Sequence, residues 1–198
     1  VFCSFDDQLF DAKALNPYTP AAYTWPSTIP QWAQEELRNE LQRLMTLLNV
    51  KTGVYNIETR LCKNGKPYIM ELAPRGGGNR LSEMMKYISG QDLIDNCVRV
   101  AVGDSIDEIH QPEYDGYWAE IILHSERDGV FQSIEIDKTV EEYFLIEKDI
   151  WVKIGDKVQG FTGANTTIGT LVLRFNTNEE MKWCLAQQDN WLHLNVER

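Results

Sequence analysis

The sequence predicts an α+β protein, with an antiparallel sheet and flanking helices followed by a smaller β-rich part. Apolar residues recur at steps of three and four through residues 31–49, which is the pattern of an amphipathic helix. Directly after this helix, the hairpin signal Asn64-Gly65 lies between two segments of alternating polarity. Beyond residue 117 the pattern changes to short strands separated by turns rich in glycine and aspartate.

The composition is that of a globular protein with excess negative charge. The 198 residues are 43% hydrophobic and 25% charged, and the formal net charge is −11. Nucleic acid and anionic membranes are therefore excluded as main partners, since both are bound through basic surfaces. No apolar run approaches the ~20 residues of a membrane helix, and the first residues contain no signal peptide pattern. The four cysteines have neither CxxC spacing nor the clustering of a disulfide scaffold, which predicts a reducing, cytoplasmic location and no zinc site.

The other elements follow from similar signals. The sequence predicts a short strand over residues 1–10 and a loop over the proline-containing residues 11–30. The hairpin arms and the helices after them are expected at about 53–62, 67–73, 80–89 and 91–102. The strands of the second part are expected at 117–124, 130–136, 142–146, 150–154 and 167–175. A last helix is expected to start at the capping box formed by Thr177 and Glu180 and to end near Gln188.

The acidic segment 104–116 contains few apolar residues and one proline. It is interpreted as a connector, so that the chain is divided into two domains, residues 1–112 and 113–198. The six tryptophans are expected to lie mainly in the core.

The hairpin places two glutamates opposite each other. If Asn64 and Gly65 form a two-residue turn, the numbers of paired residues sum to 129 and Glu58 lies opposite Glu71. Carboxylates in that position have Cβ atoms roughly 5 Å apart and repel each other. A solvated face, with Arg60 diagonal to Glu71, is one interpretation. The other is a divalent cation, because Mg²⁺ takes one or two protein carboxylates and completes its shell with water and phosphates.

The same register assigns the two faces of the hairpin. Tyr68, Met70 and Leu72 are expected on an apolar face that packs on the core. Asn56 is expected on the polar face, opposite Ala73.

A glycine loop follows the hairpin, in the sequence PRGGGNR directly before a predicted helix. Consecutive glycines let backbone N–H groups approach an anion, and a helix N-terminus adds partial positive charge. Arg75 and Arg80 bracket the loop and suit phosphate or carboxylate oxygens. A flexible turn and surface ion pairs are the alternatives. A carboxylate pair followed by an anion cradle indicates a nucleotide bound with Mg²⁺, although the GK[ST] of a P-loop is absent. The residues expected to contact the nucleotide are Gly76, Gly77, Gly78 and Asn79.

Residues 53–103 resemble the C-terminal core of the ATP-grasp domain. That pattern has a glutamate or glutamine on one strand, a short turn, then Glu-x-Asn/Ala-Pro-Arg and a glycine-rich loop, and it is matched here by Glu58 and by ELAPRGGG from Glu71 onward. The ELAPR form is similar to the ATPase subunit of phosphoribosylaminoimidazole carboxylase, and GVYNIE to AVG is similar to the large subunit of carbamoyl-phosphate synthase. The tail GDKVQGFTGANTTIGTLVLRF is similar to the C-terminal domain of ATP-grasp amino-acid ligases.

The resemblance implies an ATP-dependent ligase that activates a carboxylate as an acyl phosphate, which an amine or ammonia then attacks. It implies that Glu58 and Glu71 hold Mg²⁺ or Mn²⁺ and that Arg75 and Arg80 stabilise the transferring phosphoryl group. Such catalysis rests on positioning and electrostatic stabilisation by the protein.

The sequence departs from the family pattern in two respects, and these departures leave other functions open. Many relatives have a metal-ligating asparagine at the position of Ala73, and Asn56 is expected to take its place in part. The family's adenine pocket and phosphate-binding lysines lie upstream of this core, so the chain is interpreted as a C-terminal fragment that is inactive without the N-terminal portion. A homodimer is a further expected arrangement. The alternative functions are a non-catalytic binding or regulatory module and a carbohydrate- or protein-binding β-domain, and the carboxylate and amine substrates are not identified.

Overall fold

The computed structural model describes residues 1–106 and 108–198, so Asp107, within the predicted connector 104–116, lies outside the described residues. The chain divides into two compact units. The first consists of Val1–Phe5 and Ser27–Asp115, and the second of Asp6–Pro26 and Gly116–Arg198. The sequence placed residues 6–26 with the first domain, whereas in the structure they extend the sheet of the second unit.

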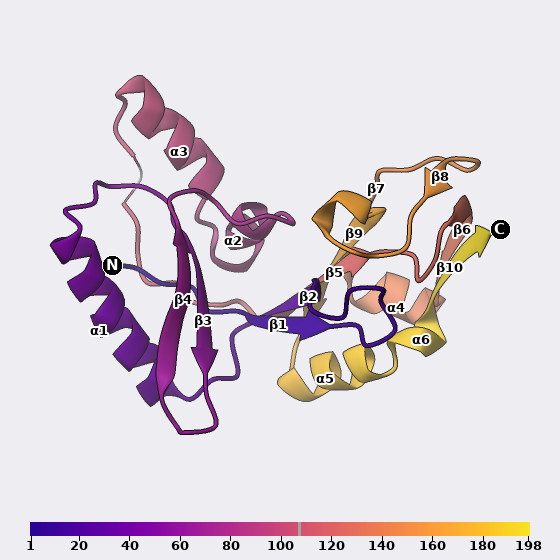
Figure 1. Cartoon of the computed structure of the whole chain (residues 1–198), viewed down its shortest axis with the longest axis horizontal. Helices are drawn as coiled ribbons and strands as arrows, with labels where there is room; N and C mark the ends of the chain where they lie inside the picture. The colour runs from indigo at the N-terminus through magenta and orange to yellow at the C-terminus, as the bar shows by residue number, and fades with distance from the viewer. Residues whose placement is uncertain (107) are drawn as a thin grey trace. The chain divides into compact units, whose positions relative to one another are not determined.

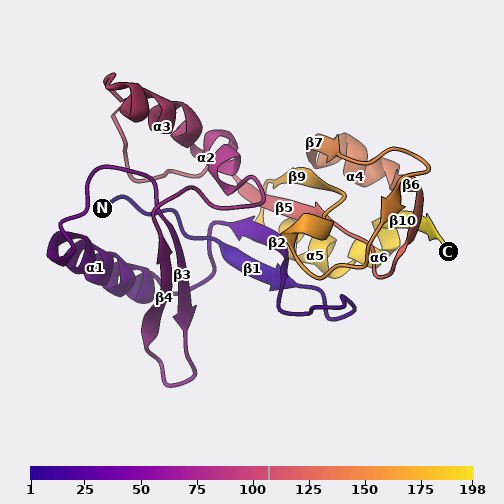
Figure 2. The same ribbon diagram turned by 45° about the horizontal axis from the view of Figure 1, so that its top comes forward.

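The first unit contains the helices and the hairpin that the sequence predicted (Figure 1). Its elements are α1 (Gln31–Leu47), β3 (Asn56–Leu61), β4 (Pro67–Ala73), α2 (Leu81–Ser89) and α3 (Leu93–Val102). The buried residues of α1 follow the predicted period of four, at Ala33, Leu37, Leu41 and Met45. This helix packs beside β4, and α2 packs against α3 (Figures 1 and 2).

The second unit is built on a five-stranded antiparallel sheet in the order β1-β2-β5-β9-β7. A separate three-stranded sheet has the order β10-β6-β8. The strands are β1 (Asp7–Phe10), β2 (Pro20–Trp25), β5 (Tyr117–Leu123), β6 (Gly129–Ile136), β7 (Leu145–Ile150), β8 (Lys157–Val158), β9 (Gly169–Phe175) and β10 (Leu192–Glu197). The helices are α4 (Lys138–Tyr143), α5 (Asn178–Ala186) and α6 (Gln188–Trp191).

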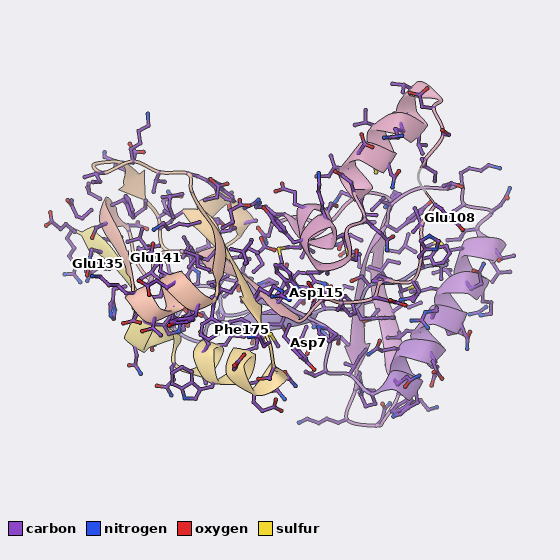
Figure 3. The ribbon with its side chains drawn as sticks, turned by 180° about the vertical axis from the view of Figure 1, so that it is seen from behind. Asp7, Glu108, Asp115, Glu135, Glu141 and Phe175 are labelled. Atoms are coloured by element: carbon purple, nitrogen blue, oxygen red, sulfur yellow. The ribbon has the colours of Figure 1, made fainter. Side chains whose placement is uncertain are left out.

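The core of the second unit lies against the central strands β5 and β9. Ile121, Leu171 and Leu173 are fully buried there. Phe175 lies inside the unit with 1% of its surface exposed, whereas Glu135 and Glu141 lie at its surface (Figure 3). The α+β fold class, with antiparallel sheets and flanking helices, is therefore confirmed.

Strand β2 corrects the prediction of a loop over residues 11–30. Its residues from Ala21 to Trp25 are all buried, and the strand is paired at both edges, with β1 and with β5. Of the four prolines that indicated a loop, Pro20 is the first residue of the strand and Pro26 follows its last, where proline is compatible with a strand, and Pro17 and Pro30 lie outside it.

Two other predicted strands are wrong, and two elements near the end of the chain were not predicted. Residues 138–143 form helix α4, which is capped by the Asp137 side chain, and the strand predicted at 142–146 begins only at Leu145. The strand predicted at 150–154 is absent from the described residues, since β7 ends at Ile150. Beyond α5 the chain forms α6 and β10, which pairs with β6 over a large sequence separation.

The tryptophans are divided between core and surface, which corrects the expectation that they lie mainly in the core. The buried ones are Trp25, Trp118 and Trp191. The exposed ones are Trp32, Trp151 and Trp183. Among the described helices, none combines the length and the hydropathy that crossing a bilayer requires.

Candidate functional site

The turn of the β3–β4 hairpin is longer than the sequence predicted. The Cys62 N–H donates to the Lys66 carbonyl at 3.0 Å, and the Gly65 N–H donates to the Cys62 carbonyl at 2.9 Å. These bonds enclose a three-residue loop in which Gly65 has φ 75°. This is the hairpin type in which a type I turn is followed by a left-handed residue, so the predicted two-residue turn is wrong.

A β-bulge restores the predicted pairing of the glutamates. Next to the turn, Thr59 pairs with Ile69, which is one residue out of the predicted register. The register shifts between Glu58 and Thr59, with Met70 as the extra residue on the opposite strand, and Glu58 then lies opposite Glu71. The predicted pairing of Glu58 with Glu71 is confirmed. The longer loop shifts the register by one residue, and the bulge shifts it back.

The bulge also changes which side chains of the hairpin are exposed. Tyr68 and Met70, which the sequence assigned to the core face, are 42% and 62% exposed, whereas Leu72 is half-buried. At Met70 the alternation of strand faces is interrupted, so Met70 and Glu71 are both exposed. The assignment of Tyr68 and Met70 to a core face is therefore corrected.

Arg60 neutralises Glu58, the glutamate on strand β3. Its guanidinium donates to the Glu58 carboxylate at 2.7 Å, along the same strand. Both side chains are partly open to solvent, with 45% and 38% of their surfaces exposed. The Glu71 side chain is exposed on the opposite strand.

The glycine loop packs closely on its surroundings. A Cβ at Gly76 would lie 2.5 Å from the Ser82 hydroxyl, and one at Gly77 would lie 2.5 Å from Leu81 Cδ1. A Cβ at Gly77 would also lie 3.1 Å from Asn56 Oδ1, so the asparagine at the start of β3 lies against the loop. Gly78 has open space on its side-chain side. Gly77 is therefore required by close contacts with Leu81, whereas a Cβ at Gly76 would need only a rotation of the Ser82 hydroxyl.

Two non-glycine residues with left-handed backbones join the loop to α2. Asn79 has φ 50° and Arg80 has φ 66°, and Arg80 occupies the N-cap position without capping the helix through its side chain. The backbone turns sharply here and the Leu81 N–H donates to the Gly78 carbonyl at 3.1 Å. The Asn79 residue predicted to contact the nucleotide lies at this turn.

The two candidate arginines have different environments. Arg75 is exposed, and its guanidinium donates to the Gly76 carbonyl at 2.8 Å. The Arg80 guanidinium, with 14% of the side chain exposed, donates from two nitrogens to one Glu83 carboxylate oxygen at 2.7 and 2.6 Å. The sequence interpretation missed Glu83 as the partner of Arg80, although its i,i+3 spacing at a helix start is a readable signal.

The site thus combines two opposed carboxylates, an adjacent amide and a glycine loop. Strand pairing brings together Glu58, Glu71 and the Asn56–Ala73 pair, and the loop contact adds Gly77. No group of three or more His, Cys, Asp or Glu side chains arranged for a metal occurs within residues 1–106 and 108–198. A pair of carboxylates with an amide fits a hard cation that draws its remaining ligands from water and a phosphate substrate.

Comparisons with known proteins agree with this arrangement at the level of the fold. No protein-family model matches the sequence. Carnosine synthase 1 of Gallus gallus is 33% identical over 86 residues, which are 43% of this chain and 9% of that protein.

Solved structures match nearly the whole chain. Phosphoribosylglycinamide synthetase from Anaerococcus prevotii has a TM-score of 0.76 at 17% identity, with 97% of this chain and 48% of that chain covered. L-amino acid ligase from Bacillus licheniformis has a TM-score of 0.76 at 18% identity, with 92% and 46% covered. The biotin carboxylase domain of 2-oxoglutarate carboxylase from Hydrogenobacter thermophilus, solved with MgADP and bicarbonate, has a TM-score of 0.69 at 13% identity, with 95% and 42% covered.

These structures are ATP-grasp ligases, and the chain has their fold. The resemblance drawn from residues 53–103 is confirmed and extends over almost the whole chain. At these identities the likeness concerns the fold. The chain spans 48%, 46% and 42% of the lengths of the three solved structures, which is less than half of each.

Proposed function

We propose that this chain is the metal- and γ-phosphate-binding part of an ATP- and Mg²⁺-dependent carboxylate–amine ligase that works through an acyl phosphate. The observation that carries the proposal is the pairing of Glu58 with Glu71, next to a glycine loop in which Gly77 leaves no room for a side chain. A sheet that places two carboxylates opposite each other gains nothing from the pair itself, whereas a cation makes the arrangement favourable.

In this proposal Glu58 and Glu71 hold Mg²⁺ or Mn²⁺, and Asn56 contributes its amide oxygen. The asparagine lies opposite Ala73, the position at which many relatives carry a metal-ligating asparagine, so it provides the same group from the neighbouring strand. The bound ion would neutralise the charge on the ATP phosphates. The ligand set is thus completed across the hairpin rather than along one strand.

The glycine loop would receive the terminal phosphate. Gly76 and Gly77 allow the backbone to pass close to Ser82 and Leu81, and Gly78 with Asn79 leads into the start of α2. Backbone N–H groups at such a turn suit an anion, and Arg75 adds positive charge at the solvent side. Arg80 would stabilise the transferring phosphoryl group after exchanging Glu83 for a phosphate oxygen, since both are anionic partners of the same guanidinium.

The substrates of the whole enzyme are proposed to be ATP, a small carboxylate and an amine or ammonia. The adenine side of the site is proposed to come from an N-terminal portion of the same protein, in line with the share of the neighbouring structures that the chain covers. The proposed compartment is the cytoplasm, where exposed thiols such as those of Cys62 and Cys97 stay reduced.

The metal assignment is tested by Mn²⁺ binding to this chain, followed by electron paramagnetic resonance. Glu58→Gln and Glu71→Gln are each expected to weaken binding by about tenfold or more, because each removes a direct ligand. Glu142→Gln changes an exposed acid on α4 in the other unit and serves as the matched control. Equal Mn²⁺ affinity in wild type and Glu71→Gln would exclude the proposed site.

A non-catalytic binding or regulatory module is the second candidate. Ala73 in the place of an asparagine favours it, as does the engagement of Arg80 by Glu83. ADP formation by the longer protein separates the two functions. If the protein is a ligase, ADP formation is lost in Glu71→Gln and kept in Glu142→Gln. A wild-type protein that binds Mn²⁺ but forms no ADP would refute the ligase and support the module.

A further inference from the structure

The second unit contains a cavity of ≈ 760 Å³ that the proposed ligase site does not use. Five segments of this unit surround it: the β1–β2 region, the end of β5 with its following turn, the end of α5, α6, and β10. Its volume lies in the range of about 300–1,000 Å³ that is usual for small-molecule sites. Part of its wall is aliphatic and is formed by Leu9, Ala22, Leu123, Leu185, Leu192 and Leu194.

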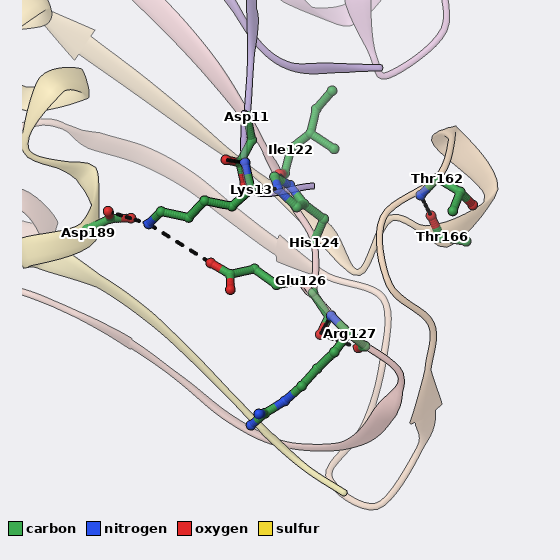
Figure 4. Close-up of polar contacts among 10 residues, drawn as sticks. Asp11, Lys13, Ile122, His124, Glu126, Arg127, Thr162, Thr166 and Asp189 are labelled. Atoms are coloured by element: carbon green, nitrogen blue, oxygen red, sulfur yellow. Dashed lines mark hydrogen bonds and ion pairs between the residues drawn. The ribbon is translucent and has the colours of Figure 1, made fainter. Parts of the chain in front are cut away.

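An ion pair crosses the polar side of this cavity. The Lys13 ammonium donates to the Asp189 carboxylate at 2.5 Å and lies 4.0 Å from the Glu126 carboxylate (Figure 4). The three side chains are 54%, 78% and 62% exposed, so the pair is open to exchange with a ligand. The hydrogen bond to Asp189 raises the pKa of Lys13, which keeps the ammonium charged throughout the neutral range.

The backbone that carries Lys13 is fixed, although its side chain is open to solvent. The Asp11 carboxylate accepts the Lys13 N–H at 2.8 Å and is 3.0 Å from His124 Nε2. His124 Nδ1 is 2.6 Å from the Ile122 carbonyl, and the imidazole is stacked on Phe161 with 4.1 Å between ring centroids. The His124 side chain is only 7% exposed. The backbone of Lys13 is therefore held, through Asp11, by a buried imidazole.

The charges around the cavity define the ligand that fits. A monovalent cation that took Asp189 would leave the Lys13 ammonium with only the 4.0 Å contact to Glu126, and a monovalent anion that took Lys13 would draw the ammonium away from Asp189. A zwitterion placed between them makes two ion pairs from one, with its carboxylate on Lys13 and its ammonium on Asp189 and Glu126. A nucleotide or polyphosphate is disfavoured because the cavity is lined by more acidic than basic side chains. The acidic ones are Asp11, Glu126 and Asp189, and the basic ones are Lys13 and Arg127.

We propose that this cavity binds a free α-amino acid with an apolar side chain, which inserts its ammonium and carboxylate groups between Lys13 and Asp189. The apolar side chain would lie on the aliphatic wall, where Leu185, Leu192 and Leu194 line the cavity. Exposed ion pairs contribute little to stability because solvent screens them, so opening the Lys13–Asp189 pair costs little. The Arg127 guanidinium is held by the Val196 carbonyl at 3.0 Å and borders the same cavity.

Titration calorimetry with L-leucine on the 198-residue chain tests the site, with neither ATP nor Mg²⁺ present, so that the result does not depend on the ligase function. Leucinamide lacks the carboxylate and N-acetyl-leucine lacks the ammonium. Each is expected to bind at least about tenfold more weakly than leucine, which corresponds to the loss of one charged contact of about 1.4 kcal/mol. Equal affinity for all three compounds, or no heat of binding with leucine up to millimolar concentration, would overturn the proposal.

Two variants locate the binding event. Lys13→Gln and Asp189→Asn are each expected to weaken leucine binding by at least about tenfold, by the same conversion. Lys157→Gln removes an exposed lysine of β8 that does not line the cavity, and its affinity is expected to equal that of the wild type. Thermal unfolding of each variant shows that it is folded, which is expected for such exposed positions. Unchanged leucine affinity in folded Lys13→Gln would exclude this cavity.

Discussion

Glu58 lies directly opposite Glu71 in the β3–β4 hairpin, and the bulge at Met70 is what aligns them. With the three-residue loop that the structure has, an unbulged hairpin would place Met70 opposite Glu58. The extra residue moves Glu71 into that position. Bulges occur often next to functional sites, where they redirect a side chain, and here the redirected side chain is one of the two proposed metal ligands.

The opposed carboxylates predict a stability effect whose sign depends on the metal. In a chelator, Glu71→Gln is expected to raise the free energy of unfolding by at most ~1 kcal/mol, because like charges opposite each other are destabilising. With Mg²⁺ the wild type gains stability by binding and the variant does not. Urea unfolding with and without Mg²⁺ measures both effects, and Glu142→Gln is the control. An equal response of wild type and Glu71→Gln to Mg²⁺ would contradict the metal site.

The glycine loop predicts a difference between neighbouring positions. Gly77→Ala brings a Cβ to 2.5 Å from Leu81 Cδ1 and is expected to lower the free energy of unfolding by about 1–3 kcal/mol. Gly78→Ala meets no atom within 4 Å and is expected to change it much less. Urea unfolding of the two variants measures the difference. A Gly77→Ala protein as stable as Gly78→Ala would show that the loop is not closely packed.

The start of α5 predicts a measurable capping contribution. The Thr177 hydroxyl accepts the Glu180 N–H at 3.1 Å, and the Glu180 carboxylate accepts the Thr177 N–H at 3.2 Å. Thr177→Ala is expected to lower the free energy of unfolding by ~1 kcal/mol. Thr177→Ser keeps the hydroxyl and is expected to stay close to the wild type. Equal losses in the two variants, measured by thermal or urea unfolding, would assign the effect to the lost methyl group instead.

The buried thiol of Cys184 predicts a loss of stability at high pH. Burial raises the pKa of this thiol to about 11, because the thiolate is poorly solvated there. The unfolded chain releases the proton at lower pH than the folded one does. The contribution of the protonated Cys184 thiol to the free energy of unfolding is therefore complete below pH ~9. It is lost as the pH rises through the pKa of the folded state, about 11.

Unfolding free energies of wild type and Cys184→Ala between pH 8 and 11 measure this contribution. The wild type is expected to lose more stability than the variant over this interval. Thiol labelling of the native protein at pH 8 gives a second measurement, in which Cys62 and Cys97 react and Cys184 reacts only after urea is added. Rapid labelling of native Cys184 would contradict its burial.

Local patterns in the sequence determined much of the fold. The apolar period of residues 31–49 gives α1, Gly90 ends α2 with φ 73°, and the Thr177–Glu180 capping box starts α5. Each signal lies within a few residues of the structure that it specifies, because helices depend on contacts between neighbours in sequence. The Asn64-Gly65 signal located the hairpin, whereas the pairing of Glu58 with Glu71 depends on the three-residue loop and on the bulge at Met70, neither of which the sequence predicted.

The tertiary structure decided what depends on distant partners. Strand β2 is a central strand because β1 and β5 pair with its two edges, and β10 exists because β6 pairs with it. The packing of the glycine loop against Asn56 and the cavity crossed by the Lys13–Asp189 pair join segments far apart in the chain. Pairing and packing at such separations leave no local pattern in the sequence, so only the folded chain shows them.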